Sequence, residues 1–125
     1  MREILLVGSG GFIGAAMRYL VGGWVHRLLD QPFFPYGTLV VNVLGCLTIG
    51  LLGGLSESRQ LFPAETRLFI FVGILGGFTT FSSFGYETLN LLRDGEFTPA
   101  VMNMTLQLGL GLLAVWGGLV ISRYL

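Results

Sequence analysis

The fold is decided by one stretch of the chain, Gly73-Ile74-Leu75-Gly76-Gly77-Phe78-Thr79-Thr80-Phe81-Ser82-Ser83-Phe84. It lies within an apolar segment long enough to cross a bilayer, yet it carries three glycines and four hydroxyl side chains, which are poor helix formers. We therefore expect the helix to break between Gly76 and Thr80. Irregular backbone is tolerated at membrane depth only where it is buried in protein or lines a cavity, so the break is expected at an interface or a pore.

The remainder of the chain is as apolar as this stretch. Of its 125 residues, 53% are hydrophobic and 11% are charged, whereas soluble domains carry about 25% charged residues. A soluble domain of this length cannot bury so much apolar surface, because small domains bury a limited fraction of the surface they carry. The solvent that fits this composition is the lipid bilayer.

Four apolar segments are long enough to span a bilayer, and we place them at residues 4–25, 36–55, 67–92 and 98–122. The loops between them are short. The first loop includes Arg27, Asp30 and Pro32, and the second begins at Ser56. No soluble domain fits into such loops, so residues 1–125 are expected to form one domain. Because backbone in lipid must satisfy its own hydrogen bonds, the fold class is an all-α membrane protein with four transmembrane helices.

The charged residues leave the orientation in the membrane open. Seven arginines balance seven acidic residues, which gives no basic surface for nucleic acid. Four spans place both termini on one side of the membrane. The arginines are Arg2, Arg59, Arg67 and Arg123 on that side, Arg27 and Arg93 on the other, and Arg18 if it faces the second rim. This asymmetry is weak for the positive-inside rule, so a fixed orientation and a two-way insertion that permits an antiparallel homodimer both remain possible interpretations.

Small residues recur at intervals that favour close helix packing. Gly10 and Gly14 are four residues apart on the first span, and Gly50 and Gly54 repeat the spacing on the second. Such pairs let helix backbones approach closely in lipid. The single cysteine, Cys46, is interpreted as a small packing residue.

Two charged side chains lie within the spans, where charges are costly and usually functional. Arg18 lies about two-thirds of the way along the first span, where it either extends to the interface or faces a water-filled vestibule. Glu87 lies in the last third of the third span and is also a vestibule candidate. No carboxylate lies near the middle of a span, which argues against proton-coupled or cation-exporting chemistry.

Neutral polar side chains lie on three of the spans. Thr38 and Asn42 are four residues apart on the second, and Asn103 and Gln107 are four apart on the fourth. An amide at this depth needs a partner, which for Asn42 is either another helix or a passing anion that accepts from its NH2 group. Together with the hydroxyls of the third span, these groups predict a narrow path with donors and no fixed positive charge at its centre.

The third span also contributes aromatic rings and backbone groups. Phe81 and Phe84 are three residues apart and project to similar sides. They either face lipid or the protein core, or line the path, because an aromatic ring has a positive edge that suits an anion. Carbonyls freed at the break are able to bind a cation, and the new half-helix ends carry partial charge.

Three segments of the chain carry a family resemblance. They are Gly10-Gly11-Phe12-Ile13-Gly14 through Arg18-Tyr19, Gly37-Thr38-Leu39-Val40-Val41-Asn42 with Gly45-Cys46, and Gly76-Gly77-Phe78-Thr79-Thr80-Phe81-Ser82-Ser83-Phe84 with Glu87. With the number, order and length of the spans, they resemble the Fluc/CrcB family of fluoride channels over essentially the whole chain. The resemblance implies an antiparallel homodimer with two pores, each lined by both chains. It also implies passive fluoride export across a bacterial plasma (inner) membrane.

The same resemblance implies roles for individual residues. They are Phe81 and Phe84 as pore phenylalanines, Asn42 as the pore amide, Thr38, Ser82 and Ser83 as a hydroxyl track, Glu87 at one pore end, and Arg18 as the first-helix arginine of the family. A structural sodium ion is implied on the dimer axis, held by backbone carbonyls of Gly76 and Thr80. The fourth helix departs from the family, whose members often carry serine, tyrosine or histidine there, so Asn103 and Gln107 remain possible pore residues.

Two other protein classes share some of these features. A small multidrug exporter has a similar size and four helices, but it depends on a glutamate deep in the first helix, where this chain has only Glu3 at the rim. A non-transporting assembly subunit explains the glycines but not the polar groups on three helices. The sequence therefore favours a channel, not an enzyme, whose partners are fluoride, a second copy of the chain and the lipid bilayer.

Overall fold

The computed structural model describes residues 1–30 and 33–125, and Pro32, which we placed in the first loop, lies outside them. The elements in chain order are α1 (Arg2–Leu29), α2 (Tyr36–Arg59), α3 (Ala64–Arg67), the π-helical η1 (Leu68–Leu75), α4 (Gly76–Phe78), α5 (Phe81–Arg93) and α6 (Phe97–Ser122). The segment from α3 to α5 forms one span, Ala64–Arg93, which gives four helices apolar enough to cross a membrane within the described residues. The predicted class, an all-α multi-pass membrane protein, is confirmed.

Each predicted span falls within one observed membrane span, but the observed spans are longer than predicted. Arg27 lies inside α1 and Ser56 inside α2, so placing them in loops was wrong. Hydropathy detects only the apolar part of a helix, whereas the helix continues until its backbone is capped. Asp30 and Gln60 cap α1 and α2 in the left-handed conformation, with φ of 44° and 49°.

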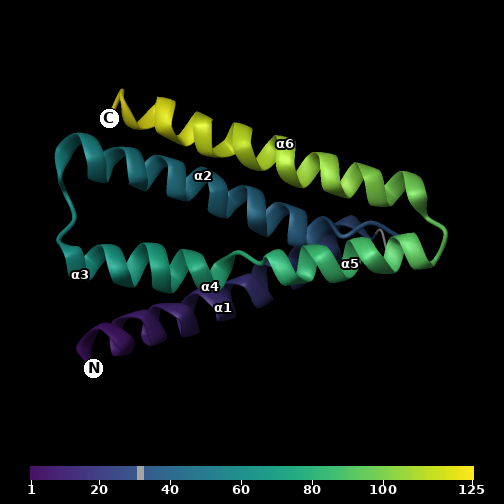
Figure 1. Cartoon of the computed structure of the whole chain (residues 1–125), viewed down its shortest axis with the longest axis horizontal. Coiled ribbons are helices and arrows are strands. Elements are labelled where there is room, and N and C mark those ends of the chain that lie inside the picture. Colours follow the sequence, from purple (N-terminus) through teal and green to yellow (C-terminus); the bar gives the residue numbers. More distant parts are fainter. Residues whose placement is uncertain (31–32) are drawn as a thin grey trace.

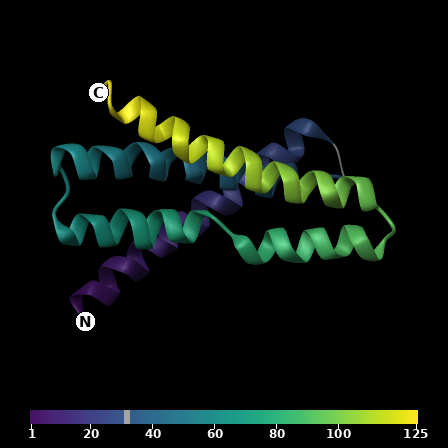
Figure 2. The same ribbon diagram turned by 45° about the horizontal axis from the view of Figure 1, so that its top comes forward.

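The helices form an elongated bundle with both termini at the same end (Figure 1). This placement agrees with an even number of spans. The most extensive packing joins α2 to α6, followed by α1 to η1. Figure 2 shows α1 crossing the third span near the point where that span is interrupted.

Close backbone approach at glycines holds these crossings. On α1, Gly10 and Gly14 face the third span, and a Cβ atom on Gly14 would overlap the carbonyl oxygen of Ile74. On α2, a Cβ atom on Gly50 would overlap the Val115 carbonyl of α6. The prediction that these glycines permit close helix packing is confirmed.

The third span is interrupted at Thr79 and Thr80, which have extended backbones with ψ of 158° and 115°. The interruption lies within the predicted interval, but Gly76 belongs to the short helix α4, so the glycines themselves do not break the helix. The two threonines end it instead. The Thr79 hydroxyl donates to the Leu75 carbonyl at 3.0 Å, and the Thr80 hydroxyl caps α5 by accepting from the Ser83 N–H at 3.1 Å.

The crossing of α1 and the third span predicts different costs for two glycine substitutions on α1. Gly14→Ala should lower the free energy of unfolding by about 1–3 kcal/mol, because the added methyl group overpacks the backbone of Ile74. Gly23→Ala is the matched control, because no atom lies within 4 Å of its Cβ position. Denaturation of the two variants in detergent micelles measures the difference. Equal stability would contradict the close crossing.

Candidate functional site

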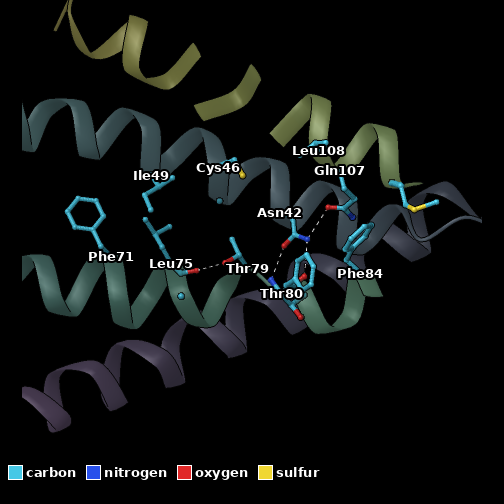
Figure 3. A pocket seen from close by; sticks show the side chains of 14 residues that line it. Asn42, Cys46, Ile49, Phe71, Leu75, Thr79, Thr80, Phe84, Gln107 and Leu108 are labelled. Carbon is cyan, nitrogen blue, oxygen red and sulfur yellow. Dashed lines mark hydrogen bonds between the residues drawn. The ribbon is translucent and has the colours of Figure 1, made fainter. Parts of the chain in front are cut away.

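One side chain, Asn42 on α2, bridges the interruption of the third span (Figure 3). Its Oδ1 atom accepts from the Thr80 N–H at 2.8 Å, and its Nδ2 atom donates to the Thr80 carbonyl at 3.0 Å. In a continuous helix the Thr80 N–H would donate to the Gly76 carbonyl. The Asn42 amide therefore takes the place of the missing helical partner, which stabilises an extended backbone near the middle of the span.

The second N–H of Asn42 joins α2 to α6. It donates to Oε1 of Gln107 at 3.1 Å, so both hydrogens of the Asn42 amide are engaged. Of the two alternatives that the sequence left open for Asn42, this structure shows the interhelical hydrogen bonds. Gln107, whose role the sequence left open, is placed beside Asn42.

A cavity of about 450 Å³ lies between α2, α6 and the interrupted span. Its polar lining includes Asn42, Gln107 and Thr80, and Phe81 and Phe84 belong to the same wall. The two rings meet edge-on, with centroids 5.5 Å apart and planes at 60°. Phe81 is 82% exposed in the single chain. The predicted pore phenylalanines and the pore amide therefore share one cavity, which is neutral and mainly apolar.

A second cavity, of about 190 Å³, is lined by both predicted charged residues, Arg18 and Glu87, and by two of the predicted hydroxyl residues. The Thr38 hydroxyl donates to Oε1 of Glu87 at 2.8 Å, and Ser83 lines the same space. Arg18 turns toward the third span, where its Nε atom donates to the Gly77 carbonyl at 3.1 Å. The sequence left open whether Arg18 extends to the membrane interface or faces a cavity, and in the structure it lines this cavity. Thr80 lines both cavities, so the interruption forms their common wall.

Two predicted residues lie apart from both cavities. Ser82 is exposed, and its hydroxyl lies 3.3 Å from that of Thr80. Asn103 is fully buried, and its Nδ2 atom donates to the Thr88 hydroxyl at 2.9 Å. Asn103 therefore connects α5 to α6, and within this chain it does not contribute to the cavity that holds Gln107.

His26 lines the second cavity with Arg18, although no expectation from the sequence concerned it. A signal for it was present in the sequence. Arg18, Gly22 and His26 follow one another at intervals of four residues, so they lie on one face of α1 and all three border this cavity.

In the part of the chain that the structure describes, four membrane-length helices with a polar interruption in the third define the class as a helical multi-pass membrane protein. Residues 5–119 match the model of the family described as CrcB-like protein, Camphor Resistance (CrcB), and the chain belongs to this family.

Curated relatives match over the whole chain. A protein of Geobacter metallireducens named fluoride-specific ion channel FluC is 42% identical over 125 residues, which is 100% of both chains. A protein of Methanosarcina barkeri named fluoride-specific ion channel FluC 3 is 43% identical over 100% of this chain and 96% of its own. A protein of Rhizobium etli named fluoride-specific ion channel FluC is 43% identical over 100% of this chain and 99% of its own. All three relatives are named as ion channels and not as enzymes.

The bridge made by Asn42 predicts local opening when it is removed. Asn42→Ala leaves the Thr80 N–H without its acceptor, at a cost of about 1–3 kcal/mol. Hydrogen exchange of the Thr80 amide should accelerate accordingly. Thr48→Ala is the control on the same helix, because the Thr48 hydroxyl donates only within α2, to the Leu44 carbonyl. Unchanged exchange at Thr80 in the Asn42 variant would show that the bridge is not needed.

Proposed function

We propose that this protein is a passive, fluoride-selective ion channel that exports fluoride from the cytoplasm and lowers its concentration there. One observation carries the proposal: Phe81, Phe84 and a pair of side-chain amides line a single uncharged cavity at the interruption of a membrane span. The edge of an aromatic ring is the positive part of its quadrupole, and an amide N–H group is the positive end of a dipole, so both attract an anion. The relatives named as fluoride-specific ion channels support fluoride as that anion.

The chemistry of fluoride fits such a lining. Fluoride is small and strongly hydrated, so a selective path must replace its water with donors at short range, and a narrow path excludes larger halides. Conduction also requires binding weak enough for the ion to leave, which neutral groups permit better than a buried positive charge. A negative cell interior favours anion exit by about 2.3 kcal/mol per charge per 100 mV, so no energy-coupling site is required.

The second cavity is proposed as a vestibule at one end of this path. Arg18 would raise the local anion concentration there, because its guanidinium is always charged. Ser83 would supply a hydroxyl donor between the vestibule and the interruption. Thr38, which donates to Glu87 at the pore end in this structure, would turn its hydroxyl from that carboxylate to a passing ion. Ser82, which is exposed in the single chain, would join this track only from a surface covered by another chain.

A second copy of the chain, arranged antiparallel, is proposed to complete the path. Phe81 is 82% exposed, and the extended Thr79 and Thr80 are only partly covered in one chain. Irregular backbone facing lipid is not tolerated, so another protein surface must cover it. Two copies would form two equivalent pores, each lined by both chains. The weak arginine asymmetry supports insertion in both orientations, here into a bacterial plasma (inner) membrane.

A structural sodium ion is proposed on the dimer axis, held by backbone carbonyls of Gly76 and Thr80. The interruption supports this donor set. The Thr80 N–H, which would occupy the Gly76 carbonyl in a continuous helix, donates to Asn42 instead. The Thr80 carbonyl accepts one bond from Asn42, and a carbonyl oxygen has a second lone pair. Two carbonyls from each of two chains would replace part of the hydration shell of the ion.

Efflux from liposomes tests the proposed function. Wild-type protein should release fluoride much faster than chloride. Phe81→Ile and Phe84→Ile should each slow fluoride efflux by about tenfold or more, equivalent to roughly 1.4 kcal/mol in barrier height, because an aliphatic side chain has no positive edge.

Phe12→Ile is the matched control, because Phe12 is 77% exposed on α1 and lines neither cavity. Its efflux should equal that of the wild type. Equal rates for fluoride and chloride would exclude the proposed selectivity, and full activity of the Phe81 and Phe84 variants would return both rings to a lipid-facing role.

Removal of sodium tests the proposed ion. The dimer should be weaker in sodium-free medium, with a higher dissociation constant than in sodium medium. The reason is that the carbonyls at the interruption would then face each other without a cation. Cross-linking yield in detergent, measured against a potassium-matched control, reports the change. Identical dimer yields in both media would exclude the proposed structural role of sodium.

A further inference from the structure

We propose that Gln107 supplies the amide N–H that meets the anion beside Phe84, and that the Thr80 N–H fixes this arrangement through Asn42. The inference rests on the proposed function and assigns the donor within the same cavity. Asn42 and Gln107 both border this cavity, but only one of the two amides has a donor left to offer.

The orientation of Asn42 is determined by the interrupted backbone. The Thr80 N–H can only donate, so it selects the oxygen of the Asn42 amide, at 2.8 Å. The NH2 group of Asn42 must then occupy the opposite position. Its two hydrogens go to the Thr80 carbonyl and to Gln107, at 3.0 and 3.1 Å. In this arrangement Asn42 has no hydrogen left for an ion.

The orientation of Gln107 follows from that of Asn42. An NH2 group facing another NH2 group would be repelled, so Gln107 must turn its oxygen toward Asn42 and its Nε2 atom away. Figure 3 shows the Gln107 amide between Asn42 and Phe84. Within the described part of the chain, the buried Nε2 atom has no hydrogen-bond partner. A buried donor without an acceptor is unfavourable, and an anion would satisfy it.

The two amides therefore act as a polarised chain that begins at a backbone N–H and ends in an unused NH2 group. This end attracts an anion and disfavours a cation without placing a fixed charge in the path. The Nε2 atom is covered from solvent, so an ion reaches it by displacing a neighbouring side chain, for which Phe84 is well placed on the same cavity. The preference for anions over cations would then originate at the Thr80 N–H, which orients Asn42 and, through it, Gln107.

Two substitutions separate donation from positioning. Gln107→Glu keeps an oxygen for Asn42 but replaces the NH2 group with a second oxygen, and Gln107→Met has similar length with neither group. Both should slow fluoride efflux by about tenfold or more, the loss expected for one hydrogen bond to a charged group. Leu112→Met, on the same helix but outside both cavities, should keep wild-type efflux.

Hydrogen exchange at Thr80 identifies the cause of any loss. We expect Gln107→Met to lose efflux while protection of the Thr80 amide stays as in the wild type, because the two Asn42–Thr80 bonds do not involve Gln107. Wild-type efflux in Gln107→Met, or loss of Thr80 protection together with efflux, would overturn the inference and leave the proposed function intact. Wild-type protein that releases no fluoride would overturn both.

Discussion

The rest of the structure depends on one interaction, the pairing of the Asn42 amide with the peptide of Thr80. A membrane span gains stability from its continuous backbone hydrogen bonds, so an interruption requires a replacement partner at the same depth. Asn42 provides both a donor and an acceptor from a neighbouring helix. This pairing permits an extended backbone near the middle of the third span, and that backbone is where both cavities meet.

Close helix packing makes this pairing possible. Gly10 and Gly14 bring α1 against the backbone of the third span before the interruption, and a Thr79 methyl group lies where a Cβ atom on Gly45 would stand. Arg18 adds a hydrogen bond to the Gly77 carbonyl, next to the interruption. The uncharged cavity therefore lies between elements that are fixed by backbone contacts. Rigid positioning suits a selective path, because short-range donors discriminate between ions only when they cannot relax around a larger one.

Much of the fold could be predicted from the sequence, because the spans are marked by hydropathy and the crossings by glycine spacing. The helix ends were less predictable, since left-handed caps at Asp30 and Gln60 extend α1 and α2 beyond their apolar parts. The location of the interruption was predicted, but not its cause. The hydroxyls of Thr79 and Thr80 bond locally within the third span, whereas the Thr80 backbone bonds to Asn42 on another helix, and the sequence does not reveal that contact. The π-helical η1 has no signal in its apolar sequence. The connection of Gln107 to Asn42 depends on the packing of α2 on α6, which periodicity does not specify.

The central claim is that a neutral chain of donors conducts fluoride passively, without coupling to another ion. The potential at which net current stops in a bilayer that contains the protein tests it most directly. With a fluoride gradient, a chloride gradient of opposite direction and a separate pH gradient, the account predicts a potential that follows fluoride alone. A potential that shifts with the pH gradient, or that does not change sign when the fluoride gradient is reversed, would contradict the account.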